Sequence, residues 1–339
     1  MSKKKKFNIW KFLLNLLLIG LFGWLIFQNI TSYKVLLDTI QDANLVLLGY
    51  AVLIGIGNLA TYSFIYQKSI ALVSKKQQYP EFLNKTFAFL FINISTPLGL
   101  TGASAYLTRY LVKKGLSNIQ AVFGLLIANL SINVSFLFIL GFTVFSLSNA
   151  NHLEPYQTLA AELLLLMNVG LFLATFFIIV LPSFSGKAAH FIVNIINSLT
   201  RTLIRKELLA GKTSDDYILE TITISKRFDR SFGKFASTIP LSLTYHLINI
   251  SVLFLSFAAF GQTIDLWKVI SLYGIIFLFA IVSPTPYGIG IVEGLAHTAA
   301  ISLGIDSSVS LVAILTYRVA TIWLPAIAGL INLRRSHRE

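Results

Sequence analysis

The stretch SPTPYGIGIVEGLAH, residues 283–297, decides the fold. It lies between two strongly apolar runs, IIFLFAIV before it and SLVAILTYRVATIWLPAIAGLI further on, yet it contains two prolines and two glycines. Proline removes a backbone donor and breaks a helix, and glycine readily adopts the conformations in which helices end. The stretch therefore predicts a membrane helix that is broken inside the bilayer, with Glu293 just inside the helix that follows.

The composition places the chain in a membrane. Of its 339 residues, 55% are hydrophobic and 12% are charged, against about 25% charged in soluble domains, and the mean hydropathy is +0.76. Cysteine is absent and the five histidines are scattered, so we expect no disulfide framework, metal centre or cofactor. The net charge is +13, and the basic residues lie in loops between apolar runs. Basic loop residues set the topology of a membrane protein, so nucleic acid is not expected as a partner.

Eight apolar runs are long enough to cross a membrane or enter it, since spanning takes about 20 residues. They occupy 10–29, 43–66, 87–108, 121–147, 158–181, 236–260, 269–305 and 309–331. The sequence thus predicts an all-α polytopic membrane protein, with one integral membrane domain over 1–339. No small-residue cleavage site follows the first run, which we interpret as an uncleaved span.

A polar, basic segment at 183–235 interrupts this pattern. It contains HFIVNIINSLTRTLIRK, whose apolar residues recur at helical spacing. Such a helix lies on a membrane surface or packs on neighbouring helices as a solvated element, and both interpretations stay open.

Basic residues predict the topology, because cytoplasmic loops carry excess Lys and Arg. If 87–108 crossed fully, the cluster RYLVKK at 109–114 would face outside. If the segment instead enters from the cytoplasm and turns back, all but three of the 27 basic residues face the cytoplasm. The exceptions are Lys34, Lys268 and Arg318. Both termini are then cytoplasmic in a bacterial cell membrane, and 269–305 opens from the exterior.

The two broken segments also resemble each other. TPLGLTGASAYLTRYLVKKGLS starts at Thr96 and TPYGIGIVEGLAHTAAISLGID starts at Thr285. At this constant offset, Thr96, Pro97, Gly99 and Gly115 align with Thr285, Pro286, Gly288 and Gly304. Matches among common membrane residues also arise by chance. The opposite orientations favour an inverted repeat, with halves at about 1–150 and 158–335, which is typical of alternating-access transporters.

Arg318 and Glu293 are the strongest candidate site residues. A charge at the bilayer centre costs about 2.5–3.5 kcal/mol, so it usually faces a cavity or a partner. In the functional interpretation, Arg318 binds a lipid phosphate, and Glu293 pairs with Arg318 or with a cationic head group. In the structural interpretation, the ion pair only holds the hairpin to the last span. His297, on the same helical face as Glu293, is a second polar contact or a satisfied interior histidine. Arg109 meets lipid phosphates at the cytoplasmic mouth or belongs to a topogenic cluster.

The breaks themselves predict a cavity. Pro97 and Gly99 in the first break, and Pro286, Gly288 and Gly290 in the second, free backbone groups that are tolerated only inside protein or beside water. Helix N-termini at the breaks carry partial positive charge and suit an anionic phosphate. Hydrogen bonds in the first break would come from Asn93, Ser95, Thr96, Thr101 and Ser104. Asn129 and Asn133 would extend this lining, although interhelical packing explains these two equally well.

The C-terminal part of the chain resembles the transmembrane, flippase-like region of lysylphosphatidylglycerol synthases, which also occurs as stand-alone membrane proteins. That family typically shows Pro-x-Gly-x-Gly-x-x-Glu, a later Gly, and a span with Tyr-Arg and then Leu-Pro. The matching residues are Pro286, Gly288, Gly290, Glu293, Gly304, Tyr317, Arg318, Leu324 and Pro325. The first-half motif departs from the pattern, because Ala103-Ser104 stands where many members have Gly-Glu. The resemblance covers most of the chain, and 1–80 is its least distinctive part.

The resemblance implies a lipid translocator. In full-length relatives this region is thought to move aminoacylated phosphatidylglycerol to the outer leaflet, which protects against cationic peptides, while a separate cytoplasmic domain makes the lipid. We expect that domain to be missing here, and whether the chain is an enzyme stays open. The expected substrate is an anionic or aminoacylated phospholipid, or a polyprenyl- or glycolipid. Alternatives are participation in lysyl-phosphatidylglycerol formation and a non-transporting scaffold for a separate synthase; the oligomeric state is left open.

Overall fold

The computed structural model describes residues 41–74, 79–96, 99–149, 155–204, 212–229, 232–283 and 285–336. Within these ranges every regular element is a helix. Four helical stretches are long and apolar enough to cross a membrane, or five if a bent pair counts as one span. The predicted all-α polytopic membrane fold is confirmed, and the predicted run at 10–29 lies outside the described residues.

The helices follow the predicted apolar runs closely. Their bounds are α3 Leu45–Ile70, α4 Tyr79–Ser95, α5 Leu100–Lys113, α6 Asn118–Asn149, α7 Pro155–Val180, α8 Pro182–Ile204, α9 Lys212–Asp229, α10 Phe232–Ala236, α11 Ile239–Ala259, α12 Leu266–Val282, the short 3₁₀ turn η2 Pro286–Gly288, α13 Ile291–Ser302, α14 Ser307–Arg318, the π-helix η3 Val319–Trp323 and α15 Leu324–Ser336.

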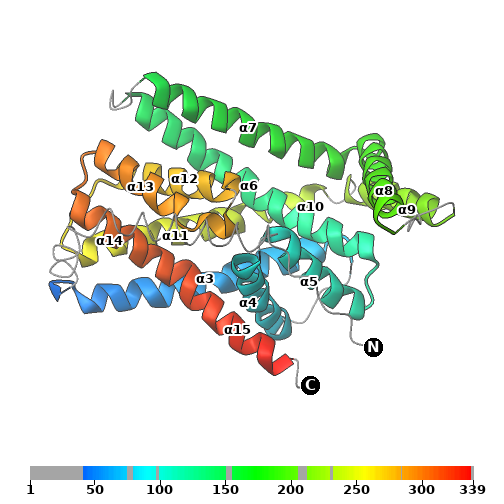
Figure 1. Ribbon diagram of the computed structural model, residues 1–339, viewed down its shortest axis with the longest axis horizontal. Helices are drawn as coiled ribbons and strands as arrows, with labels where there is room; N and C mark the ends of the chain where they lie inside the picture. Colours follow the sequence, from blue (N-terminus) through cyan, green and yellow to red (C-terminus); the bar gives the residue numbers. More distant parts are fainter. Residues whose placement is uncertain are drawn as a thin grey trace.

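The long helices α3, α6, α7 and α11 run along the long axis of the molecule (Figure 1). At the left end of that view, the Asn44 N–H at the start of α3 donates to the Ala259 carbonyl at the end of α11, 2.7 Å away. At the right end, Lys68 Nζ donates to the Ser237 carbonyl at 3.0 Å. The helices α8 and α9 also lie at the right end.

Both predicted broken segments are present, and they approach from opposite ends. The pair α4–α5 lies at the centre and right of centre of the view, whereas α12 and α13 lie to the left (Figure 1). The tips meet between the ends, because Leu90 and Ile94 of α4 share a buried cluster with Tyr287 and Ile289 of the second break. The molecule therefore holds two incomplete crossings that face each other.

The repeat seen in the sequence extends to backbone conformation. Gly115 and Gly304, which align in the repeat, adopt left-handed φ values of 93° and 73°, and each ends its helix in a Schellman-type hydrogen-bond pattern. Two residues later, Ser117 and Asp306 cap the next helices by accepting backbone N–H groups of the first turn. The same signals thus end α5 and α13 and start α6 and α14.

The basic segment forms a helical layer across the right end. The axis of α8 is bent by 105° from that of α7, and α8 packs on α9, where a side chain at Gly186 would meet Ile222. Phe191 and Ile192 of α8 nevertheless remain exposed, at 66% and 55%. The segment therefore combines the two features left open by the sequence, because it packs on a neighbour and keeps an uncovered apolar face.

Candidate functional site

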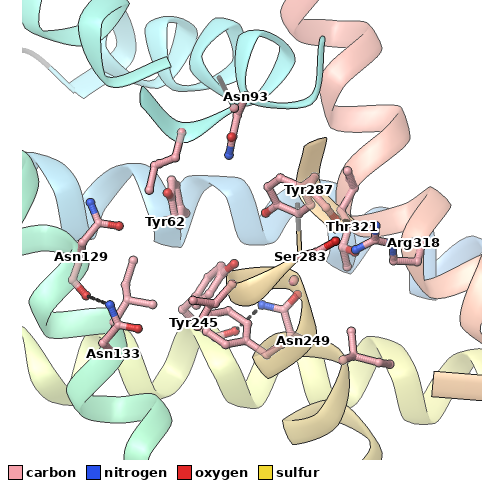
Figure 2. Close-up of a pocket in the computed structure, with 18 of the residues that line it drawn as sticks. Tyr62, Asn93, Asn129, Asn133, Tyr245, Asn249, Ser283, Tyr287, Arg318 and Thr321 are labelled. Atoms are coloured by element: carbon pink, nitrogen blue, oxygen red, sulfur yellow. Dashed lines mark hydrogen bonds between the residues drawn. The ribbon is translucent and has the colours of Figure 1, made fainter. Parts of the chain in front are cut away.

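A cavity of about 390 Å³ lies where the two breaks meet. Gly99 and Leu100 border it from the first break, and Ser283, Thr285 and Tyr287 border it from the second. The remaining polar lining comes from Tyr62 of α3, Asn93 of α4, Asn129 and Asn133 of α6, Tyr245 and Asn249 of α11, and Tyr317, Arg318 and Thr321 of the last span (Figure 2). Apolar side chains such as Ile132, Ile276 and Phe277 complete the wall.

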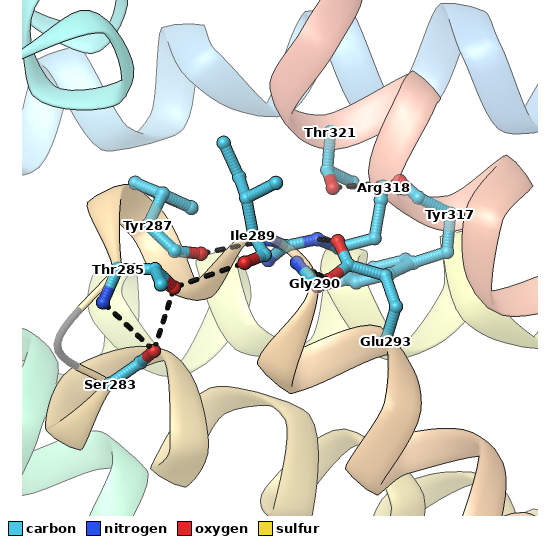
Figure 3. Close-up of polar contacts among 9 residues, drawn as sticks. All are labelled: Ser283, Thr285, Tyr287, Ile289, Gly290, Glu293, Tyr317, Arg318 and Thr321. Atoms are coloured by element: carbon cyan, nitrogen blue, oxygen red, sulfur yellow. Dashed lines mark hydrogen bonds and ion pairs between the residues drawn. The ribbon is translucent and has the colours of Figure 1, made fainter. Parts of the chain in front are cut away.

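Arg318 and Glu293 form a buried ion pair at one side of this cavity (Figure 3). Arg318 Nε donates to Glu293 Oε1 at 2.7 Å, and the two side chains are 1% and 12% exposed. The second carboxylate oxygen of Glu293 accepts the N–H of Gly290 at 2.7 Å. Glu293 therefore caps the start of α13 and ties the second break to α14 through one charged group.

The backbone of the second break is shaped around the guanidinium. Tyr287 has a left-handed φ of 54°, which is uncommon for a residue with a bulky side chain and is typical of functional sites. Its carbonyl accepts from Arg318 Nη2 at 2.8 Å, and its ring centroid lies 5.7 Å from the guanidinium carbon. The unusual conformation thus directs a carbonyl and an aromatic ring at Arg318.

Hydroxyl groups provide part of the hydrogen bonding for the non-helical backbone of the second break. Ser283 Oγ and Thr285 Oγ1 lie 3.0 Å apart, and the Thr285 hydroxyl donates to the Ile289 carbonyl at 3.1 Å (Figure 3). Irregular backbone at membrane depth requires such internal partners. The described residues of the second break therefore have a polar network of their own.

The last span also departs from regular helix beside the site. Directly after Arg318, the helix widens into the π-helix η3, and the Leu324 N–H reaches back five residues to the Val319 carbonyl. Pro325 has no N–H to donate, which weakens the normal ladder at this point. Short π-helical turns are frequent at functional sites because they redirect neighbouring side chains. A side chain at Gly55 of α3 would lie 2.8 Å from the Ala320 carbonyl, so α3 packs directly on this turn.

The helix N-termini at the two breaks differ in charge. At α13 the N-terminus already holds the carboxylate of Glu293. At α5 the N-cap is Gly99, with φ 45°, no side-chain cap and no acidic residue in the first turn. Because Gly99 and Leu100 border the cavity, the partial positive charge of α5 faces it without a built-in anion.

Four asparagines supply most of the remaining polarity. Asn93 is 8% exposed, and Figure 2 shows its amide directed into the cavity; it makes no hydrogen bond with any described residue. Asn129, Asn133 and Asn249 each donate to the carbonyl four residues earlier at 2.9 Å. Each of these three amides therefore uses an N–H on its own helix.

A second hollow of about 860 Å³ adjoins the cavity between α5 and α6. It shares Leu100, Asn129 and Asn133 with the cavity, and it also contains Arg109 and Lys113 of α5. We call it the α5–α6 groove. Most of its other lining is apolar or hydroxylic, including Val112, Val122, Leu125, Leu126, Thr108 and Thr175.

The predicted site residues therefore fall into several places. Arg318, Tyr317 and Gly99 line the cavity, Glu293 and Gly290 lie directly behind Arg318, and Pro286 and Gly288 form the η2 turn. Arg109 lies in the α5–α6 groove. His297 is hydrogen-bonded to Ser310 at 2.8 Å and is not among the lining residues. Pro97 lies outside the described residues.

Sequence reasoning did not identify several lining residues. Tyr62 of α3 and Tyr245 and Asn249 of α11 belong to segments that looked like ordinary apolar runs, and Tyr287 was not singled out within the second break. One signal was available, because Tyr245 and Asn249 are four residues apart and share a helical face in the middle of a span. The contribution of α3 had no comparable signal, since it depends on which helices pack together.

The fold and the cavity define a polytopic helical membrane protein with a polar chamber between two broken segments. The model of the family described as the lysylphosphatidylglycerol synthase TM region matches residues 12–329, and the chain belongs to this family. This membership confirms the resemblance seen in the motifs and connects the protein to lysylphosphatidylglycerol and lipid biology. A search of curated proteins finds no match to the sequence.

Proposed function

We propose that this protein moves a lipid between the leaflets of the bacterial cell membrane. The substrate class is an anionic or aminoacylated phospholipid, or a related polyprenyl- or glycolipid. The observation that carries the proposal is the single cavity bordered by the tips of two broken segments from opposite ends of the molecule. A site between two such segments is typical of transporters that work by alternating access.

Arg318 and the start of α5 would hold the phosphate. Arg318 Nε donates to Glu293, and Nη2 donates one hydrogen bond to the Tyr287 carbonyl. The N–H groups of Nη1 have no acceptor among the described residues. Guanidinium groups bind phosphate oxygens through paired N–H donors. The uncapped N-terminus of α5 supplies further donors on the same cavity. Glu293 keeps the empty site neutral, so Arg318 tolerates burial without substrate.

The α5–α6 groove would be the path between the cytoplasmic leaflet and the cavity. The right end carries Lys68, Lys113 and Lys114 and the basic segment with α8 and α9, so we assign it to the cytoplasm. Arg109 and Lys113 would attract the phosphate, and the apolar part of the groove would accept the acyl chains. The head group would then pass Leu100 into the cavity.

A reconstituted transfer assay tests this function. Liposomes that contain the purified protein and fluorescent phosphatidylglycerol should show accelerated transfer between leaflets, measured as the fraction of probe accessible to a membrane-impermeant quencher. Arg318→Met should abolish the acceleration, whereas Arg334→Met, which removes an exposed charge from the end of α15, should not. The unfolding transition of each variant must first show that it is folded.

Two results would contradict the proposal. Equal transfer in protein-free and protein-containing liposomes for every lipid class named above would exclude translocation. A new aminoacyl lipid in extracts of cells that express only this chain would instead favour direct participation in lysyl-phosphatidylglycerol formation. If Arg318→Met transfers lipid as fast as wild type, the assignment of the phosphate site is wrong even if translocation is right.

A further inference from the structure

The cavity lining contains very little charge. Among the described residues that line it, Arg318 is the one ionised side chain, and its charge is matched by Glu293 directly behind it. Both oxygens of Glu293 are already engaged, one by Arg318 and the other by the Gly290 N–H. The lining thus offers no carboxylate that is free to receive a cation.

Apart from Arg318, the hydrogen-bonding groups that line the cavity are neutral and include both donors and acceptors. Asn93 is buried, points into the cavity (Figure 2) and keeps its donors and its acceptor unused by the described residues. Asn133 uses one N–H on its own helix and leaves its side-chain oxygen without a described donor. Hydroxyl groups donate and accept at once, so they match a wall of amides better than ammonium groups, which only donate.

Aromatic faces cover another part of the wall. The rings of Tyr62 and Tyr245 lie with centroids 5.5 Å apart, and both line the cavity together with Tyr287. A mostly apolar wall with a few convergent amides and hydroxyls is typical of sites that fix a small neutral group by orientation. The cavity volume of about 390 Å³ is comparable to roughly a dozen water molecules, which suits one such group attached to a phosphate.

From this lining we infer the head-group class of the substrate: a phosphate ester that carries a neutral, hydroxyl-rich group, such as glycerol or a sugar, in preference to an aminoacyl group with free ammonium ions. This inference rests on the proposed function. A lysyl head group would bring two positive charges beside Arg318, and an uncompensated buried charge is strongly unfavourable. A glycerol or sugar would form hydrogen bonds with the amides of Asn93 and Asn133 and would add no charge.

A selectivity assay with a charge substitution tests this inference. The full chain is reconstituted, and the transfer rates of fluorescent phosphatidylglycerol and fluorescent lysyl-phosphatidylglycerol are compared in the same liposomes. Wild type should move phosphatidylglycerol faster by about tenfold or more, given the cost of an unpaired cation. Asn93→Asp places a carboxylate in the cavity and should shift the rate ratio toward the lysyl lipid by a similar factor. Asn84→Asp makes the same change at an exposed position of α4 and should leave the ratio unchanged.

The outcomes separate this inference from the proposed function. Equal or faster transfer of lysyl-phosphatidylglycerol by wild type overturns the inference and leaves translocation standing, as does a folded Asn93→Asp variant with an unchanged ratio. If wild type moves neither lipid, translocation of these lipids fails. Native mass spectrometry of the detergent-solubilised chain with both lipids added then decides the head-group class. Retention of phosphatidylglycerol over the lysyl lipid supports the inference, and the reverse overturns it.

Discussion

Replacing Glu293 by glutamine tests how strongly the second break depends on its ion pair. The substitution keeps the size of the side chain but removes its charge, so Arg318, which is 1% exposed, loses its counter-ion. The amide has one acceptor oxygen and one NH2 donor, so it can face only one of the two donors that the two carboxylate oxygens accept, Arg318 Nε and the Gly290 N–H. The variant therefore leaves a buried charge unpaired and one of these two donors without its acceptor.

The expected loss of stability is large because both lost interactions are buried. Removing one partner of a buried ion pair costs about 3–5 kcal/mol, most of which is the penalty of the charge left behind. Arg318→Met alone leaves Glu293 with one remaining donor, Gly290, and should cost a similar amount. The double variant Glu293→Gln, Arg318→Met removes both charges, so it should be no less stable than the worse single variant.

Equilibrium unfolding in mixed detergent–SDS micelles measures these free energies. Circular dichroism follows the unfolding of the whole protein, and the emission of its four tryptophans, among them Trp323 in the π-helix directly after Arg318, gives a second probe of the transition. Coupled residues show interaction energies of about 0.5–3 kcal/mol in such a cycle. If the two single effects simply add in the double variant, the side chains are not energetically coupled, and the account of the pair given above is wrong.

Three further predictions follow from the packing and topology. Gly55→Ala should destabilise the protein by about 1–3 kcal/mol, because its Cβ would overlap the π-helix backbone, while Gly57→Ala, with nothing within 4 Å, should be neutral or slightly stabilising in the same unfolding assay. Gly290→Ala should cost about 1–2 kcal/mol, because φ there is 83°. In this cysteine-free chain, Lys113→Cys should react with an impermeant maleimide only from the cytoplasm and Gln262→Cys only from outside; labelling of both from one side would refute the opposed hairpins.

Much of the fold was predictable because its signals are local. Apolar runs fixed the spans, and prolines and glycines fixed the breaks, since each acts on the backbone of its own segment. The repeat was predictable for the same reason, as Gly115 and Gly304 each end a helix through their own left-handed φ. The pairing of Glu293 with Arg318 was foreseen in the functional interpretation, next to a cationic head group, and in the structural one, because unpaired charges are rare at membrane depth.

The cavity wall was less predictable because it depends on tertiary packing. Tyr62, Tyr245 and Asn249 come from spans far apart in sequence, and nothing local shows that α3 and α11 pack side by side. Tyr287 takes a left-handed conformation that only the surrounding structure imposes. Arg109 was expected either to meet lipid phosphates or to belong to a topogenic cluster, and its place in a groove between α5 and α6 could be seen only from the helix arrangement.

The departure from the family pattern in the first half now has a physical meaning. Where many members carry Gly-Glu, this chain has Ala103-Ser104, and Ser104 lines the α5–α6 groove with Arg109 and Lys113. A glutamate at this position would place a carboxylate on the proposed path, close to the start of α5, where it would repel a phosphate and attract an ammonium group. Without this glutamate, the charged side chains among the described lining residues of the groove are Arg109 and Lys113, and both are basic. In the proposed mechanism, the absence of this carboxylate removes a partner for an aminoacyl head group and favours an anionic lipid with a neutral head, in agreement with the head-group class that we infer from the amide-lined cavity.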